Sequence, residues 1–188
     1  MIESSKIKSV MSHPNFLTLF RIAAVPAIVI LMIHPNRFFT FLAAALFGAA
    51  AITDYLDGYL ARHRGLETIL GKVMDPVADK LLVSSAFIML TAQGWIPAWI
   101  VCIIIGRELA VTGLRNIIAG KGEDISASWL GKYKTGFQIA AAIPLLIHYP
   151  YFGIDVHVIG HFFLLCALVF TIWSGVDYFI RFRKLLEI

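Results

Sequence analysis

The sequence predicts an all-α integral membrane protein with six transmembrane helices, and three observations lead to this prediction. Hydrophobic residues make up 59% of the 188 residues, above the roughly 45–50% that is usual for soluble domains, and the mean hydropathy is +0.80. The apolar residues fall into runs of about the length that spans a hydrocarbon core. Gly, Pro or charged residues bound each run. We therefore expect a single membrane domain over residues 1–188.

The first predicted span covers residues 16–33 and is interrupted by Arg21 and Pro26. A cleaved signal peptide is the alternative, but no small-residue cleavage site follows this run. Residues 1–13 space apolar side chains loosely between lysines, which suits a juxtamembrane helix on the membrane surface or a frayed tail. The other predicted spans cover residues 38–60, 72–93, 96–117, 134–149 and 158–180.

Basic residues predict the orientation, because cytoplasmic loops retain Lys and Arg. They gather before the first span, around the second and fourth connections and at the C-terminus, whereas only Arg37 falls on the other side. We therefore expect a multi-pass protein of the inner, cytoplasmic membrane with both termini and the active site facing the cytoplasm. The formal net charge of +4 accordingly indicates an anionic membrane surface as partner, and no nucleic acid.

Four aspartates in two of the predicted spans form the candidate site. Ionisable residues inside spans cost about 2.5–3.5 kcal/mol each on insertion scales, so such a cluster indicates function. Asp54 and Asp57 are three residues apart, and Asp75 and Asp79 are four apart, so each pair shares one helix face. Four anions in a low-dielectric cavity need cations between them, and ligand sets of oxygen atoms suit Mg²⁺ or Mn²⁺. We expect two such ions.

The residues between the two pairs of aspartates suit a phosphate-bearing substrate. Gly58 allows close backbone approach, and Ala61 keeps the same region narrow. Arg62 offers a planar fork of donors for phosphate oxygens. A turn between Ala61 and Gly71 would set the two helices side by side, and Gly71 would open the third span. One carboxylate at the edge of the cluster could then take a proton from an attacking hydroxyl.

These positions together resemble the signature of the CDP-alcohol phosphatidyltransferase family. The pattern D-x-x-D-G-x-x-A-R-x(8)-G-x-x-x-D-x-x-x-D is matched at every fixed position by residues 54–79. The resemblance implies a six-helix membrane fold, a homodimer, a di-metal site formed by the four aspartates, and Asp79 as the general base. It further implies that the residues that bind CDP-diacylglycerol are Asn15, Thr18, Arg21, Gly58, Ala61, Arg62, Thr68 and Gly71.

The binding site for the second substrate is predicted within residues 106–135, which are rich in cations. The cations near the expected cytoplasmic ends of the fourth and fifth spans are Arg107, Arg115, Lys132 and Lys134. Such a cluster is typical of an anion site. Two alternatives stay open, because Arg107 beside Glu108 could form an internal ion pair and Lys134 could extend toward lipid phosphates.

This segment, with parts of the first and third spans, resembles the branch of the family that uses glycerol 3-phosphate. The resemblance implies transfer of a phosphatidyl group from CDP-diacylglycerol to glycerol 3-phosphate, with release of CMP and with the four cations binding the acceptor's phosphate. Two rival functions are a family member whose acceptor is phosphatidylglycerol, and a divalent-cation or proton transporter. A transporter would explain the aspartates, but not Gly58, Ala61 and Arg62 between them.

Three histidines, His148, His157 and His161, fall near the expected outer face of the membrane. We interpret them as interfacial residues. The spacing of four residues between His157 and His161 leaves a metal pair as the alternative.

Overall fold

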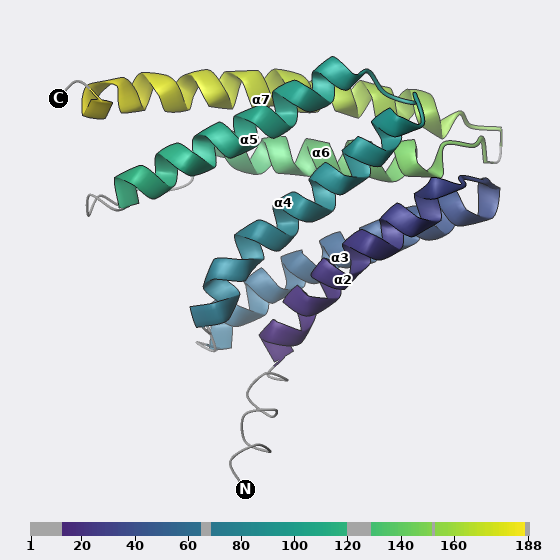
Figure 1. The fold of residues 1–188 in the computed structure, drawn as a ribbon, viewed down its shortest axis with the longest axis horizontal. Coiled ribbons are helices and arrows are strands. Elements are labelled where there is room, and N and C mark those ends of the chain that lie inside the picture. Colours follow the sequence, from purple (N-terminus) through teal and green to yellow (C-terminus); the bar gives the residue numbers. More distant parts are fainter. Residues whose placement is uncertain (1–12, 65–68, 120–128, 152, 187–188) are drawn as a thin grey trace, which may run out of the picture. The chain divides into compact units, whose positions relative to one another are not determined.

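The structure is a computed structural model that describes residues 13–64, 69–119, 129–151 and 153–186. Within these residues the chain is helical, apart from connections and an isolated β-bridge between Tyr151 and Ile154. The all-α prediction is thereby confirmed for the described part of the chain. The helices are α2 (His13–Ile33), α3 (Arg37–Arg64), α4 (Ile69–Ala92), α5 (Ala98–Ala119), α6 (Trp129–Ile147) and α7 (Val156–Leu186) (Figure 1).

Each of the six predicted spans coincides with one of these helices, although some ends differ. The turn predicted between Ala61 and Gly71 is shorter than expected, because α3 continues to Arg64 and α4 begins at Ile69. Leu60, Ala61 and Gly71 therefore lie within helices. The predicted juxtamembrane helix falls on residues 1–12, outside the described residues.

One helix in the described residues, over Val156–Arg181, is long and apolar enough by length and composition to cross a membrane. The apolar stretches Thr18–Ile33 and Arg37–Thr53 are shorter. Charged side chains interrupt the remaining helices, and several of these charges belong to the candidate site described below. Six membrane spans therefore stay a prediction, whereas six helices are observed among the described residues.

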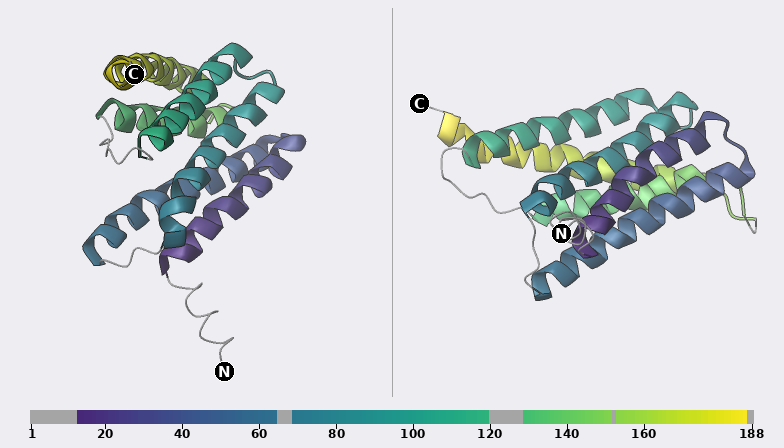
Figure 2. Two further views of the ribbon diagram at one scale, coloured as in Figure 1. Left: turned by 60° about the vertical axis from the view of Figure 1, so that its left-hand side comes forward. Right: turned by 60° about the horizontal axis from the view of Figure 1, so that its bottom comes forward.

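Packing divides the chain into two units, Met1–Met89 and Leu90–Ile188. In the first unit, α2 and α3 form an antiparallel hairpin (Figures 1 and 2). Ala24, Ile28 and Met32 follow one another at helical intervals on α2, and all three are buried. This apolar stripe is the buried face of the helix that also carries Arg21.

The connection between α2 and α3 is short because Asn36 caps α3. Its Oδ1 accepts hydrogen bonds from the backbone N–H groups of Phe38 at 3.0 Å and Phe39 at 2.9 Å. The first amides of a helix have no partner within the helix, so an Asn side chain at this position stabilises the helix start. The chain therefore reverses direction within three residues, 34–36.

In the second unit, α6 and α7 form another antiparallel hairpin, and α5 packs against α7 (Figure 2). Gly160 on α7 is buried at the contact with α6. A Cβ atom at this position would lie 2.6 Å from Leu145 Cγ and 3.0 Å from the Leu145 backbone nitrogen. The two helices therefore approach one another at a distance that only glycine permits.

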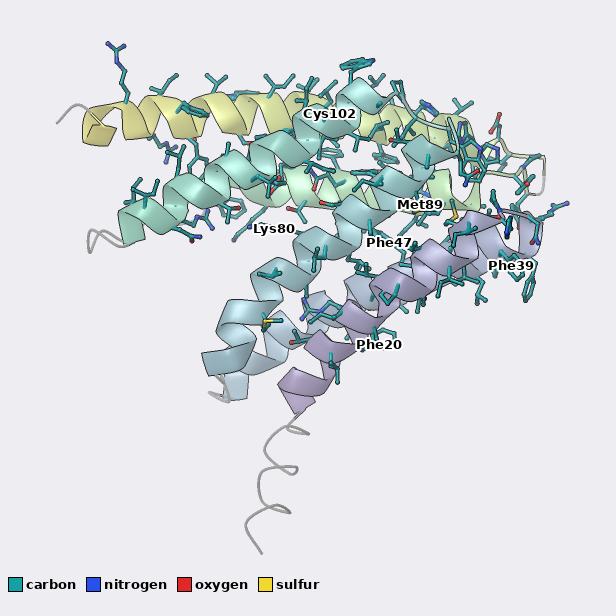
Figure 3. All side chains as sticks on the ribbon, in the orientation of Figure 1. Phe20, Phe39, Phe47, Lys80, Met89 and Cys102 are labelled. Carbon is teal, nitrogen blue, oxygen red and sulfur yellow. The ribbon has the colours of Figure 1, made fainter. Side chains whose placement is uncertain are left out.

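Many large apolar side chains lie on the outside of the helices, and several polar side chains lie inside, among a mainly apolar core. Phe39 is 37% exposed while Phe47, two turns further along α3, is fully buried (Figure 3). On α7, Trp173 is 59% exposed, whereas Thr171 and Ser174 are buried. Extended exposed apolar surface with a polar interior is what a lipid environment favours. The structure thus agrees with a membrane protein.

α4 ends in a Schellman motif at Gly94, which has a φ of +71°. The Gly94 N–H donates to Thr91 O at 2.9 Å, and the Trp95 N–H donates to Leu90 O at 3.0 Å. These bonds satisfy carbonyls at the end of the helix and fix the position of Trp95. The Trp95 ring stacks on His148, with 3.6 Å between ring centroids.

His148 lies in the α6–α7 connection and contacts His157 at the start of α7. Its Nδ1 lies 3.2 Å from Nδ1 of His157, and its backbone has a φ of 60°. Burial lowers the pKa of His148, and the nearby Asp155 carboxylate opposes this shift. His161 Nδ1 lies 3.1 Å from the His157 carbonyl oxygen, and no group of three metal-ligating side chains occurs in the described residues. The rings of His148, His157 and His161 therefore pack against one another, and a metal pair at His157 and His161 stays an alternative.

We predict that Gly160→Ala destabilises the protein, because the added methyl group would overlap Leu145. Overpacking of this kind costs about 1–3 kcal/mol. Thermal unfolding in detergent should show a lowered Tm. The control is Gly136→Ala on α6, where a Cβ would meet nothing within 4 Å. An equal Tm for the two variants would mean that the close contact of α6 and α7 is not required.

We predict that acidification destabilises the α6–α7 connection through His148. Its pKa in the folded state lies below the unfolded value of 6.5, so the unfolded chain binds more protons as the pH falls through this range. The stabilisation is therefore present above about pH 6.5 and is lost below it. Tm measured between about pH 7.5 and 5.5 should fall less in His148→Phe than in the wild type. His34→Phe, at an exposed histidine, controls for loss of an imidazole, and parallel curves for wild type and His148→Phe would contradict the assignment.

Candidate active site

The four predicted metal ligands lie on two helices of the first unit. Asp54 and Asp57 belong to α3, and Asp75 and Asp79 belong to α4. The helical backbone at these positions confirms that the members of each pair share one face of their helix. The side chains of Asp54, Asp57 and Asp75 lie outside the described residues, so convergence of the four carboxylates stays a prediction.

Chain connectivity keeps the two pairs of aspartates in the same region. Residues 65–68 separate Arg64 at the end of α3 from Ile69 at the start of α4, so the two Cα atoms are at most about 19 Å apart. Asp57 lies about two turns before the end of α3, and Asp75 about two turns after the start of α4. The carboxylates therefore belong to the same end of the two helices.

Arg21 of α2 and Asp79 of α4 form an ion pair within the first unit. Arg21 Nη1 donates a hydrogen bond to Asp79 Oδ1, and the side chains are 1% and 38% exposed, respectively. A charge buried as deeply as that of Arg21 is costly unless an opposite charge pairs with it. The structure thus brings together the predicted general base and a residue predicted to bind CDP-diacylglycerol. This contact could not be predicted from the sequence, because the two residues are 58 positions apart.

Other predicted donor-site residues occupy the same helices. Thr18 lies one turn before Arg21 on α2 and is 5% exposed, so both residues are on the buried face of the helix. Thr68 lies outside the described residues. Asn15 on α2, Gly58, Ala61 and Arg62 on α3, and Gly71 on α4 are helical in backbone, and the structure does not describe their side-chain surroundings.

Glu108 of α5 is the centre of a second charged cluster, which lies in the second unit. Glu108 Oε1 accepts a hydrogen bond from Lys134 Nζ of α6 and lies 3.4 Å from Arg107 Nη1. The side chains of Lys134, Arg107 and Glu108 are 4%, 11% and 16% exposed. The internal ion pair considered for Arg107 is therefore present. Among the described residues, the Glu108 carboxylate is shared by two cations, Arg107 and Lys134.

The guanidinium of Arg107 has hydrogen-bonding capacity that the surrounding residues do not use. Its Nε and Nη2 atoms are buried and have no hydrogen-bond partner among the described residues. Buried donors are nearly always paired in proteins, and a guanidinium matches the oxygens of a carboxylate or phosphate. The two cations together with the open donors indicate a site for an anion.

The other two predicted acceptor-site cations contact aromatic rings. Arg115 of α5 donates a hydrogen bond from Nη2 to the Tyr178 hydroxyl of α7. Lys132 is exposed, and its Nζ lies 4.9 Å from the centroid of the Trp129 ring on its own helix. The structure thus gathers Arg107, Arg115 and Lys134 around Glu108 and Tyr178, but it does not bring Lys132 to them.

Two residues of this cluster were missed or given too small a role by the sequence analysis. Tyr178 is 3% exposed and contacts both arginines of α5. Glu108 was considered only as a partner of Arg107. The available signal was the helical spacing of polar residues within apolar helices, because such residues face the interior of a bundle. Tyr178 gave a weaker signal, since a tyrosine near a helix end is equally typical of a membrane interface.

The fold, with its exposed apolar side chains and its two buried charged clusters, defines a helical membrane protein. The chain belongs to the CDP-alcohol phosphatidyltransferase family, whose model matches residues 11–173. This match runs through both units.

Curated relatives narrow the similarity to one branch of the family. The chain is 44% identical over 178 residues to the CDP-diacylglycerol–glycerol-3-phosphate 3-phosphatidyltransferase of Bacillus subtilis, covering 88% of this chain and 92% of the relative. It is 37% identical to the Escherichia coli protein of the same name, covering 88% and 91%. It is also 40% identical to a probable phosphatidylglycerophosphate synthase of Mycobacterium tuberculosis, covering 89% and 79%.

Proposed function

We propose that the protein transfers the phosphatidyl group of CDP-diacylglycerol to glycerol 3-phosphate, forming phosphatidylglycerophosphate and CMP. Relatives at 37–44% identity over most of the chain carry the name of this activity. The structural observation that carries the proposal is the buried cluster of Arg107, Lys134 and Glu108, with its open guanidinium donors. An acceptor that itself bears a phosphate would bind to the unused donors of Arg107.

In the proposed reaction, the primary hydroxyl of glycerol 3-phosphate attacks the phosphorus atom that carries diacylglycerol. A new phosphorus–oxygen bond forms, and the bond to the CMP phosphate breaks, so that CMP leaves with the bonding electron pair. Asp79 takes the proton of the attacking hydroxyl. Its hydrogen bond from Arg21 holds the carboxylate in one orientation, which supports this role.

The residues present fit a site for divalent cations. Asp54, Asp57, Asp75 and Asp79 supply oxygen ligands at helical spacings, and such ligands suit Mg²⁺ or Mn²⁺. We propose that these four aspartates hold two ions, which would stabilise negative charge on the diphosphate.

The donor substrate is assigned to the first unit. We propose that Arg62 and Arg21 interact with phosphate oxygens of CDP-diacylglycerol, and that Gly58 permits close approach of the substrate. The buried position of Arg21 supports a role beyond a surface contact. The remaining proposed donor-site residues are Asn15, Thr18, Ala61, Thr68 and Gly71.

The acceptor is assigned to the second unit. We propose that Arg107, Arg115 and Lys134 bind the phosphate of glycerol 3-phosphate. Lys132, which is exposed and lies over the Trp129 ring, stays a prediction for this site. Inositol carries no charge and serine carries no net charge, whereas a phosphate dianion offers several charged oxygens to these cations. This difference favours glycerol 3-phosphate over acceptors without net charge.

The membrane arrangement is also part of the proposal. We propose that all six helices span the inner membrane, that both termini and the active site face the cytoplasm, and that the protein is a homodimer. The outward-facing apolar side chains support membrane insertion. The basic residues near the expected cytoplasmic ends support the orientation.

The proposed function predicts release of CMP that depends on glycerol 3-phosphate. Purified protein in detergent with Mg²⁺ should release CMP from CDP-diacylglycerol when glycerol 3-phosphate is added, but not with serine, inositol or phosphatidylglycerol. Asp79→Asn should abolish turnover, and its elution on size exclusion reports whether the protein remains folded. Release with phosphatidylglycerol alone would instead identify a different acceptor. Absence of release with every alcohol, from folded protein, would refute the transferase proposal.

A second prediction concerns Arg107, whose charge we assign to the acceptor's phosphate. Arg107→Gln should raise KM for glycerol 3-phosphate by about tenfold or more, because hydrogen bonds to charged groups are worth about 1.5–3 kcal/mol. KM for CDP-diacylglycerol should change little. Arg181→Gln provides a matched control, since Arg181 is 63% exposed and pairs with Asp177 at 3.1 Å. A larger rise in KM for CDP-diacylglycerol than for glycerol 3-phosphate would move Arg107 to the donor site.

A further inference from the structure

Tyr178 of α7 takes part both in the packing of α7 against α5 and in the cationic cluster. It is 3% exposed and lies in an apolar cluster with Val111 and Ile118 of α5. The centroid of its ring is 5.7 Å from Cζ of Arg107 and 5.7 Å from Cζ of Arg115. Its hydroxyl oxygen accepts a hydrogen bond from Arg115 Nη2. One buried side chain therefore contacts both arginines of α5.

The contacts with Tyr178 limit the movement of the Arg107 guanidinium, which has few other contacts among the described residues. Arg107 meets Glu108 at 3.4 Å through Nη1, while its Nε and Nη2 have no hydrogen-bond partner among the described residues. A guanidinium within about 6 Å of an aromatic centroid is attracted to the ring, more strongly where water is excluded. The Tyr178 ring is thus a major contact that orients the Arg107 head group.

Gly175 contributes to the same arrangement from one turn earlier on α7. A Cβ atom at Gly175 would lie 3.3 Å from Arg107 Cγ, so the arginine stem passes close over this glycine. Residues 175 and 178 share one face of the helix. The glycine therefore gives room for the stem of Arg107, while the tyrosine contacts its head group.

We propose that Gly175 and Tyr178 form a clamp that positions Arg107 and Arg115 to bind the phosphate of the acceptor. The inference rests on the proposed function and extends it to α7, whose last turns lie beyond the family match over residues 11–173. Tyr178 is a positioning residue, because it acts through the two arginines. Its removal should weaken acceptor binding without altering the donor site.

The test is graded substitution at Tyr178, with KM measured for both substrates. Tyr178→Phe removes the hydroxyl contact to Arg115 and keeps the ring, and should raise KM for glycerol 3-phosphate about fivefold. Tyr178→Leu also removes the ring, and should raise it by about thirtyfold. KM for CDP-diacylglycerol should stay within about twofold of the wild type in both variants.

Phe179→Leu is the matched control, because Phe179 is the next residue on α7 and is 53% exposed. It should leave both KM values unchanged. If Tyr178→Leu does not fold, Tyr178→Phe and Gly175→Ala still test the clamp, since both should raise KM for glycerol 3-phosphate alone. Unchanged KM for glycerol 3-phosphate in the folded variants, or an equal rise for both substrates, would overturn the proposal.

A binding measurement separates failure of the clamp from failure of the proposed function. Inorganic phosphate should raise the Tm of the wild type and should raise it less in Tyr178→Phe, whether or not glycerol 3-phosphate is the acceptor. If wild-type protein shows no turnover with glycerol 3-phosphate but retains this difference, the function fails and the clamp stands. If turnover occurs and phosphate protects both proteins equally, the clamp is refuted and the function stands.

Discussion

Pairing of buried charge is the constraint on which the rest of this structure depends. Arg21 is 1% exposed and Lys134 is 4% exposed, and neither could remain charged at such depth without an acid nearby. Asp79 and Glu108 meet this requirement from neighbouring helices, so each ion pair also ties two helices together. In each cluster, the acidic or the basic residue of the ion pair also has a proposed role in catalysis or substrate binding. The same contacts that stabilise the helices therefore hold the candidate catalytic and binding groups in place.

Because the exterior of the helices is apolar, these ion pairs are stronger than they would be in water. Lipid offers no hydrogen bonds, so polar groups such as Thr171 and Ser174 are directed inward, and large apolar side chains cover the outside. Without water between them, helices associate by close packing, which explains the glycine at position 160 against Leu145. Interior polarity is thus concentrated in a few clusters, where the electrostatic interactions are strong because the surroundings have a low dielectric constant.

The sequence predicted the helices well because apolar runs and their boundaries are local signals. Their ends were less accurate, as at Arg64 and Ile69, since a helix continues as long as its backbone hydrogen bonds are satisfied and the family signature carries no information on this. The aspartate pairs followed from spacing alone. The contact of Arg21 with Asp79 and the role of Tyr178 could not be predicted, because both depend on which helix faces come together in space.

The distribution of charge along the chain suggests how acceptor choice is encoded. The acidic signature at residues 54–79 lies wholly in the first unit, whereas Arg107, Arg115 and Lys134 lie in the second. In the proposed function, chemistry on CDP-diacylglycerol would use the first set whatever the alcohol, and recognition of a phosphate on the acceptor would use the second. A family that shares one donor can therefore vary its acceptor by changing the buried residues of α5, α6 and α7. In this chain, Tyr178 is the residue of α7 that we propose for this set, and it lies beyond the residues that the family model matches.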